Sequence, residues 1–162
     1  MVRIFGLALP RVARIIAIGA LGFLVTAGAA HAQTPAPPNP QYLFPGGAGF
    51  VLNFIKPDKT SDWEAMMDKI INALKMSEKS ERQAQGKSWK ILKAAEQPVK
   101  EAVLYMWLIE NAPPDTEYSM VKILTELFPK EAADMYKEYS SFYNTQPAQQ
   151  FFHLSVVKDY TK

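Results

Sequence analysis

Four side chains of this sequence have types that can hold or transform a small molecule. Asn53, Tyr105, Trp107 and His153 contribute an amide, a phenol, an indole and an imidazole. Side chains alternate between the two faces of a β-strand, and alternation along three predicted strands places all four on the same face of a sheet. A hollow with aromatic walls and a few convergent polar groups is typical of sites that orient a flat apolar ligand. These four residues are therefore the candidate ligand pocket.

The same residues limit the chemistry that can be expected. Cofactor-free oxygenation of a polycyclic phenol needs a pocket and groups that move protons, which Asn53, Tyr105 and His153 can supply. Catalytic residues stay unknown, because an interior Asn is commonly structural and a Tyr or Trp on a strand commonly belongs to a core or an interface. The chain has no cysteine, and its other histidine is His31 near the N-terminus. We therefore expect no metal site and no cofactor.

The spacing of apolar residues predicts the elements that would position these side chains. Residues 49–56 are rich in aromatic and β-branched side chains, which predicts a strand. Residues 60–74 have apolar side chains at the three–four spacing of a helix. Ser61 and Glu64 have the spacing of a capping box, which would satisfy backbone amides at the start of this helix.

The rest of the chain repeats this unit with one extra strand. The polar segment 77–85 extends the first helix or forms a second one, and Gly86 is expected to stop it in the left-handed conformation. On the helix that begins near Glu117, the residues expected to face inward are Val121, Leu124, Leu127 and Phe128. The remaining predicted elements are strands at 88–94, 102–110 and 151–158 and a helical segment at 130–143.

The predicted order β-α-β-β-α-β consists of two split β-α-β units. Right-handed crossovers put both helical segments on one face of a four-stranded antiparallel sheet. The fold class is therefore predicted as α+β, a ferredoxin-like sandwich over residues 48–162.

The strand at 49–56, the helix opening at Asp62-Trp63-Glu64 and the strand that carries Trp89 resemble the dimeric α+β barrel superfamily, which includes antibiotic-biosynthesis-monooxygenase-like proteins. The resemblance implies a ferredoxin-like domain that pairs into a barrel. In haem-degrading relatives an Asn of the first strand and a Trp of the third are functional, and Asn53 and Trp107 occupy comparable places. Their catalytic His lies on the second helix, which has no histidine here.

The N-terminal residues 1–32 have the composition of a cleaved signal peptide. Three arginines and an apolar run precede Ala30-His31-Ala32, which has the pattern of a cleavage site, and a Pro-rich linker follows at 33–47. We expect a periplasmic or secreted bacterial protein. The leader holds 3 of the 18 basic residues, which leaves 15 against 16 acidic residues and a net charge of −1. This balance favours neither nucleic acid nor, after cleavage, a membrane as partner.

Alternation also predicts which face of the sheet the helices cover. Plain aliphatic and phenyl groups such as Phe50, Leu52 and Met106 are expected beneath the helices. The opposite face is expected to be open and apolar, and to form a homodimer with Asn53 and His153 enclosed between the two sheets. The residues expected at this interface are Val51, Ile55, Val103, Tyr105, Trp107, Ile109, Phe151 and Val157.

From these observations we expect a binding or interaction module with an aromatic-lined cavity for a small apolar ligand. The alternative is a cofactor-free monooxygenase-like enzyme that acts on an aromatic or quinone-like compound.

Overall fold

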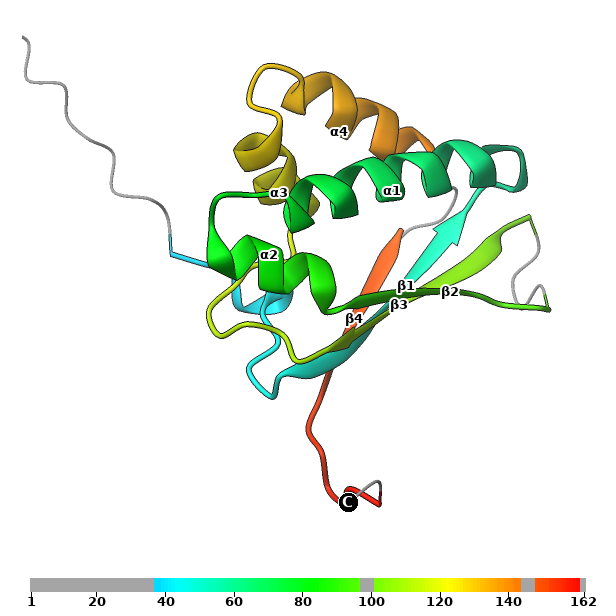
Figure 1. The fold of residues 1–162 in the computed structure, drawn as a ribbon. Helices are drawn as coiled ribbons and strands as arrows, with labels where there is room; N and C mark the ends of the chain where they lie inside the picture. Colours follow the sequence, from blue (N-terminus) through cyan, green and yellow to red (C-terminus); the bar gives the residue numbers. More distant parts are fainter. Residues whose placement is uncertain (1–36, 97–100, 144–147, 161–162) are drawn as a thin grey trace, which may run out of the picture. The chain divides into compact units, whose positions relative to one another are not determined.

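The computed structural model describes residues 37–96, 101–143 and 148–160, which form four α-helices, two short 3-10 helices and four strands (Figure 1). The predicted signal peptide lies outside the described residues. In chain order the elements are β1 (Ala48–Ile55), α1 (Thr60–Lys75), α2 (Ser80–Lys87), β2 (Trp89–Lys93), β3 (Val103–Glu110), α3 (Met120–Leu127), α4 (Ala132–Ser141) and β4 (Gln149–Leu154).

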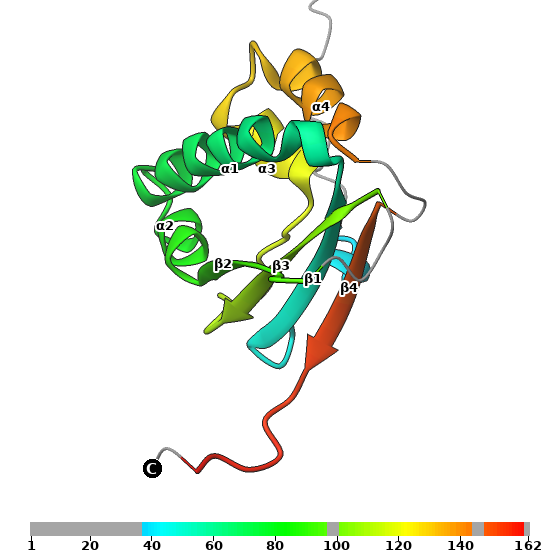
Figure 2. The ribbon, with the colours of Figure 1, turned by 90° about the vertical axis from the view of Figure 1, so that its right-hand side faces the viewer.

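The strands form one antiparallel sheet in the order β2-β3-β1-β4 (Figure 2). The two central strands, β1 and β3, pair over eight residues, from Ala48 opposite Glu110 to Ile55 opposite Val103. This topology confirms the predicted α+β class, the antiparallel sheet and the order of the elements.

The helices lie against one face of the sheet, and the core fills the space between these two layers (Figures 1 and 2). The long apolar face of α1 packs here, with Trp63, Met67, Ile70 and Leu74 almost fully buried. The sheet residues buried beneath the helices are Val51, Asn53, Ile55, Trp89, Tyr105, Trp107 and Ile109.

The predicted assignment of the two faces is therefore wrong. The face that carries Val51, Asn53, Tyr105 and Trp107 is covered by helices, so these residues cannot form the expected interface between two copies. Both faces are apolar, and alternation alone does not say which one the helices cover. The bulky aromatic side chains fill the gap beneath the helices, where Glu64 of α1 and Tyr143, just after α4, satisfy the polar groups of Tyr105 and Asn53.

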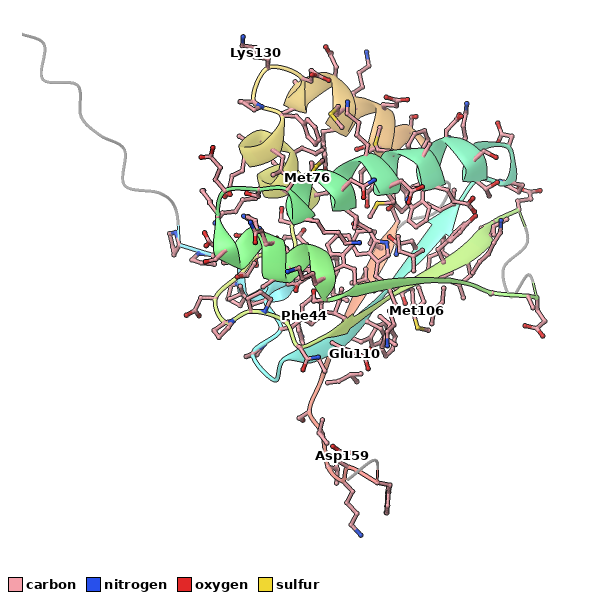
Figure 3. All side chains as sticks on the ribbon, in the orientation of Figure 1. Phe44, Met76, Met106, Glu110, Lys130 and Asp159 are labelled. Carbon is pink, nitrogen blue, oxygen red and sulfur yellow. The ribbon has the colours of Figure 1, made fainter. Side chains whose placement is uncertain are left out.

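None of the described helices lies on the opposite side of the sheet, where most side chains are apolar and the exceptions are Gln150, Lys90 and Glu110. We call this surface the open face. Met106 lies near its centre and points away from the helices (Figure 3). The residues of the open face are Phe50, Leu52, Phe54, Leu92, Leu104, Met106, Leu108, Phe152 and Leu154.

The segment before β1 belongs to the domain. Phe44, in the Pro-rich stretch, is buried, and its ring packs edge-on against Tyr118 with centroids 5.0 Å apart. A side chain at Gly49 would collide with this ring: a Cβ there would lie 2.2 Å from Phe44 Cε1 and 2.6 Å from the carbonyl oxygen of Phe152. Gly49 is therefore needed because the linker docks directly on the backbone of β1.

Gly49→Ala should destabilise the protein by about 1–3 kcal/mol, the usual cost of overpacking a core. The added methyl group must displace the Phe44 ring and the backbone of β4. Urea unfolding followed by tryptophan fluorescence measures the effect. Ser155→Ala, at an exposed site just after β4, is the control and should change the free energy of unfolding by no more than about 0.5 kcal/mol. Equal stability of the two variants would contradict this docking.

Two predicted helix signals are also wrong. No side chain caps the start of α1, because the helix begins at Thr60 and places Ser61 inside its first turn. Gly86 lies within α2 rather than beyond its end, and a Cβ there would come within 2.9 Å of Leu74 Cβ. Gly86 is therefore suited to the close approach of α2 to the end of α1.

The predicted inward face of the 117–128 helix is partly wrong as well. Leu124 is buried as expected, but Val121 is 51% exposed, and the other buried residues of α3 are Met120 and Ile123. Leu127 and Phe128 are partly buried against the core. The helix begins three residues later than predicted, and its buried face is rotated towards Met120.

Candidate functional site

Asn53 lies at the centre of a hydrogen-bonded cluster between the sheet and α4. Its Oδ1 accepts hydrogen bonds from Tyr143 Oη at 3.0 Å and from Gln149 Nε2 at 2.6 Å, and its Nδ2 donates to the carbonyl of Val51 at 3.1 Å. Gln149 Nε2 also lies 2.8 Å from Tyr139 Oη, and the hydroxyls of Tyr139 and Tyr143 are hydrogen-bonded to each other. Asn53 therefore joins β1, β4 and the end of α4.

The two tyrosines of this cluster are held neutral. Burial raises the pKa of Tyr139 and of Tyr143 well above the usual value for a phenol, because a phenolate would lose its hydration there. Neutral phenols donate and accept hydrogen bonds but do not act as bases near pH 7. The cluster is therefore suited to fixing the position of α4 on the sheet.

Asn53→Ala should destabilise the fold by about 1–3 kcal/mol, the cost of leaving buried partners without a hydrogen bond. Tyr143 and Gln149 would each lose an acceptor that no water can replace easily in a buried site. Thermal and urea unfolding measure this loss. As a control, Asn72→Ala alters an exposed amide on α1 and should have little effect. A loss of ligand binding in Asn53→Ala at unchanged stability would contradict the structural role.

Tyr105 adjoins Asn53 on β3 but points its hydroxyl to the surface beside α1. The hydroxyl donates a hydrogen bond to the carboxylate of Glu64, which also accepts one from Lys93 Nζ at 3.2 Å. The Lys93 ammonium lies 5.2 Å from the centroid of the Tyr105 ring. The hydrogen bond from Tyr105 lowers the pKa of Glu64, and burial raises the pKa of Tyr105. Glu64, predicted to cap its own helix, instead ties α1 to β2 and β3.

Trp107 is fully buried and stacks on Trp89 of β2, with ring centroids 4.7 Å apart. Trp89 in turn stacks on Tyr118 at 5.6 Å. Among the described residues, the indole nitrogens of Trp89 and Trp107 have no acceptor within hydrogen-bonding distance. Burial raises the pKa of Tyr118 to about 12, so this hydroxyl stays neutral beside Ser88, with which it shares a 2.7 Å hydrogen bond. This aromatic stack fills the core beneath α2.

His153 lies away from the other three residues. It pairs with Gly49 on β1, four residues from Asn53, which is about 13 Å along a strand. Its side chain is exposed, with Nε2 3.3 Å from the carbonyl oxygen of Gln41 and its ring 5.5 Å from that of Phe44. The four predicted pocket residues therefore divide among a hydrogen-bonded cluster, a surface ion pair, an aromatic stack and an exposed edge.

Two surface hollows occur elsewhere in the described part of the chain. One, of about 280 Å³, lies between α1 and α4, with the thioethers of Met66 and Met135 and the charges of Asp62, Lys69 and Glu138 on its walls. The other, of about 160 Å³, has charged walls that include Arg82 of α2 and Glu126 of α3. Neither contains Asn53, Tyr105, Trp107 or His153.

Arg82 is the most buried charge of the second hollow. Its Nε and one terminal nitrogen donate to the two carboxylate oxygens of Glu126 at 3.0 and 2.9 Å, and the other terminal nitrogen donates to the carbonyl of Glu117 at 3.1 Å. A fork of this kind fixes α2 against α3 and the loop before it. The charges of this hollow are thus engaged in holding the helices together.

The open face is the largest surface whose location the sequence analysis predicted wrongly, because its residues were expected beneath the helices. Its central residues are partly exposed, whereas Leu92, Phe152 and Leu154 are 47%, 40% and 41% exposed. The Phe50 and Phe152 rings stack with centroids 4.5 Å apart. At one end, Lys90 and Glu110 form an ion pair across β2 and β3, so their charges cancel.

The described residues thus define an α+β protein with helices on one side of a four-stranded antiparallel sheet and an apolar open face on the other. Among these residues no helix is long and apolar enough to cross a membrane, and no group of acidic, His or Cys side chains is placed to hold a metal ion. Comparisons with protein families, with curated proteins and with solved structures find no match for the chain.

Proposed function

We propose that this protein is an interaction module that pairs with a second copy through the open face and binds a small apolar or aromatic ligand between the two sheets. The observation that supports this proposal is the largely apolar character of that face, on which nine apolar side chains outnumber Gln150 and the Lys90–Glu110 pair. An antiparallel sheet with one side in water normally alternates to polar residues there. Nine neighbouring apolar side chains form the kind of contiguous patch that marks an interaction site on a soluble protein.

A second copy suits this surface because the face carries no net charge. Its centre carries no ionised group, and the Lys90–Glu110 pair at one end is neutral overall. Two such faces related by a twofold axis meet without repulsion between like charges. Burial can contribute about 1.5–3 kcal/mol for each large apolar side chain before the cost of association is subtracted.

The ligand would lie between the two sheets in this proposal. Stacked phenyl rings from Phe50 and Phe152 and flexible side chains such as Met106 provide walls for a flat apolar molecule. This arrangement is that of a ferredoxin-like dimeric α+β barrel, the superfamily that the sequence resembles. Export by residues 1–32 would place the module in the periplasm or the medium.

Light scattering at micromolar concentration and titration with 1-anilinonaphthalene-8-sulfonate test the proposal together. We expect the mass of a dimer and saturable binding of this aromatic probe. Monomeric protein would contradict it.

Aerobic incubation with hydroquinones separates a binding module from an oxygenase. We expect binding without consumption of the hydroquinone. Turnover that disappears in His153→Ala would instead establish the enzyme.

A further inference from the structure

The six residues after β4 leave the sheet as an exposed segment, which we call the arm (155–160). A strand was predicted to continue to Lys158, but β4 ends at Leu154, because its partner strand β1 begins at Ala48 opposite Leu154. The arm runs away from the helices in both views, and Asp159 lies far from the rest of the domain (Figures 1, 2 and 3). Its apolar side chains are open to solvent: Val156, Val157 and Tyr160 are 73%, 92% and 85% exposed.

The composition of the arm opposes a return to its own sheet. Folding back would need a tight turn directly after Leu154, and the residues there are Ser155, Val156 and Val157. Two consecutive β-branched residues favour extended backbone, the arm has no glycine or proline, and its bend at Val157 comes three residues after the end of β4. The backbone of the arm instead continues away from the helices, towards the side where the proposed second copy lies.

We propose that the arm of each copy packs against the open face of the other copy and completes the interface of the dimer. This inference rests on the proposed pairing of the open faces. Six residues reach up to about 20 Å when fully extended, and a four-stranded sheet is about 14 Å wide between its outer strands. An arm can therefore cross much of its partner's sheet.

The size of the open face supports a contribution from the arm. Four strands of about seven residues have a projected area of about 400 Å², which the accessible surface of their side chains exceeds. A standard interface buries about 800 Å² on each partner. Val156, Val157 and Tyr160 supply additional apolar surface where the sheet alone is small.

Changing the arm without shortening it tests its role. We expect the triple variant Val156→Ser, Val157→Ser, Tyr160→Ser to raise the dissociation constant of the dimer at least about tenfold in sedimentation equilibrium. Its thermal unfolding as a monomer should match that of the unchanged protein, because these side chains are exposed within one copy. A chain that ends at Ser155 should behave in the same way. If these variants form a dimer of unchanged affinity, the role of the arm is overturned but the pairing of the faces is not. If the protein without substitutions is a monomer, both proposals are overturned.

A mixed sample shows whether the arm reaches the other copy. The chain has no cysteine, so Val157→Cys carries a nitroxide label at a single site. Mixed with ¹⁵N-labelled protein that lacks the label, it should broaden amide resonances of the open face in the labelled partner. A nitroxide at Val121→Cys on α3 is the matched control and should broaden none of them. Open-face resonances of the ¹⁵N-labelled partner that stay sharp in the mixed sample would overturn the proposal.

Discussion

Met106→Glu is expected to convert the proposed dimer into a monomer. Met106 lies on β3 near the centre of the open face, between Leu52 of β1 and Leu92 of β2 in the register of the sheet. Pairing two faces would bury two new carboxylates near each other in an apolar interface, which opposes association by both desolvation and repulsion. The dissociation constant should rise at least about 100-fold, which corresponds to about 3 kcal/mol. Sedimentation equilibrium measures the change.

The matched control is Val121→Glu, which introduces the same charge at a half-exposed apolar residue on α3, on the helical side of the domain. It should leave the dimer intact. Circular dichroism should show that both variants fold, because neither site is part of the buried core. A dimer that survives Met106→Glu, or dissociates equally in Val121→Glu, would contradict the interface.

Arg82→Met should cost about 3 kcal/mol of the free energy of unfolding, close to the usual result of breaking a buried ion pair. The Arg82 side chain is 5% exposed and that of Glu126 is 25% exposed. Removing the guanidinium therefore leaves the Glu126 carboxylate without its partner and only partly accessible to water. Lys79→Met is the matched control, since Lys79 contacts the same carboxylate at 3.2 Å but is 57% exposed. Its effect should not exceed about 1 kcal/mol. Equal losses in the two variants would contradict the role of the buried pair.

The pH dependence of this effect has a definite sign. The hydrogen bond from Arg82 holds the pKa of Glu126 below its usual 4.5. A lowered pKa in the folded state stabilises the protein above the unfolded value and loses that contribution as the pH falls through the folded value. The difference in stability between the unchanged protein and Arg82→Met should therefore be full above pH 4.5 and shrink in more acidic solution. Urea unfolding at several pH values measures it, and a difference that grows on acidification would be incompatible with the pair.

The order of the elements could be predicted because each one has its own local signal. The apolar run of β1, the three–four spacing of α1 and the alternation of β3 each specify a type of element without reference to the others. The boundaries of an element were harder to predict where tertiary contacts set them. β4 ends at Leu154 because its partner strand begins opposite it, and nothing between Ser155 and Lys158 signals this limit.

The candidate site was harder to predict because both faces of the sheet are apolar. The orientation of the faces depends on which side chains find partners on the helices, and Asn53 finds Tyr143 ninety residues later in the chain. Tyr139 and Tyr143 stand four residues apart at the end of the 130–143 segment, and this spacing was the available signal for a polar cluster. Gln149 had no such signal, because only the pairing of β1 with β4 brings it to Asn53.

An isotope-filtered nuclear Overhauser measurement tests the central proposal most directly. A mixture of ¹³C-labelled and unlabelled protein reports only contacts between different copies. Pairing of the open faces predicts intermolecular signals to the methyl groups of Leu52, Met106 and Leu108. Their absence from a concentrated sample, or signals confined to helical residues such as Val121, would contradict it.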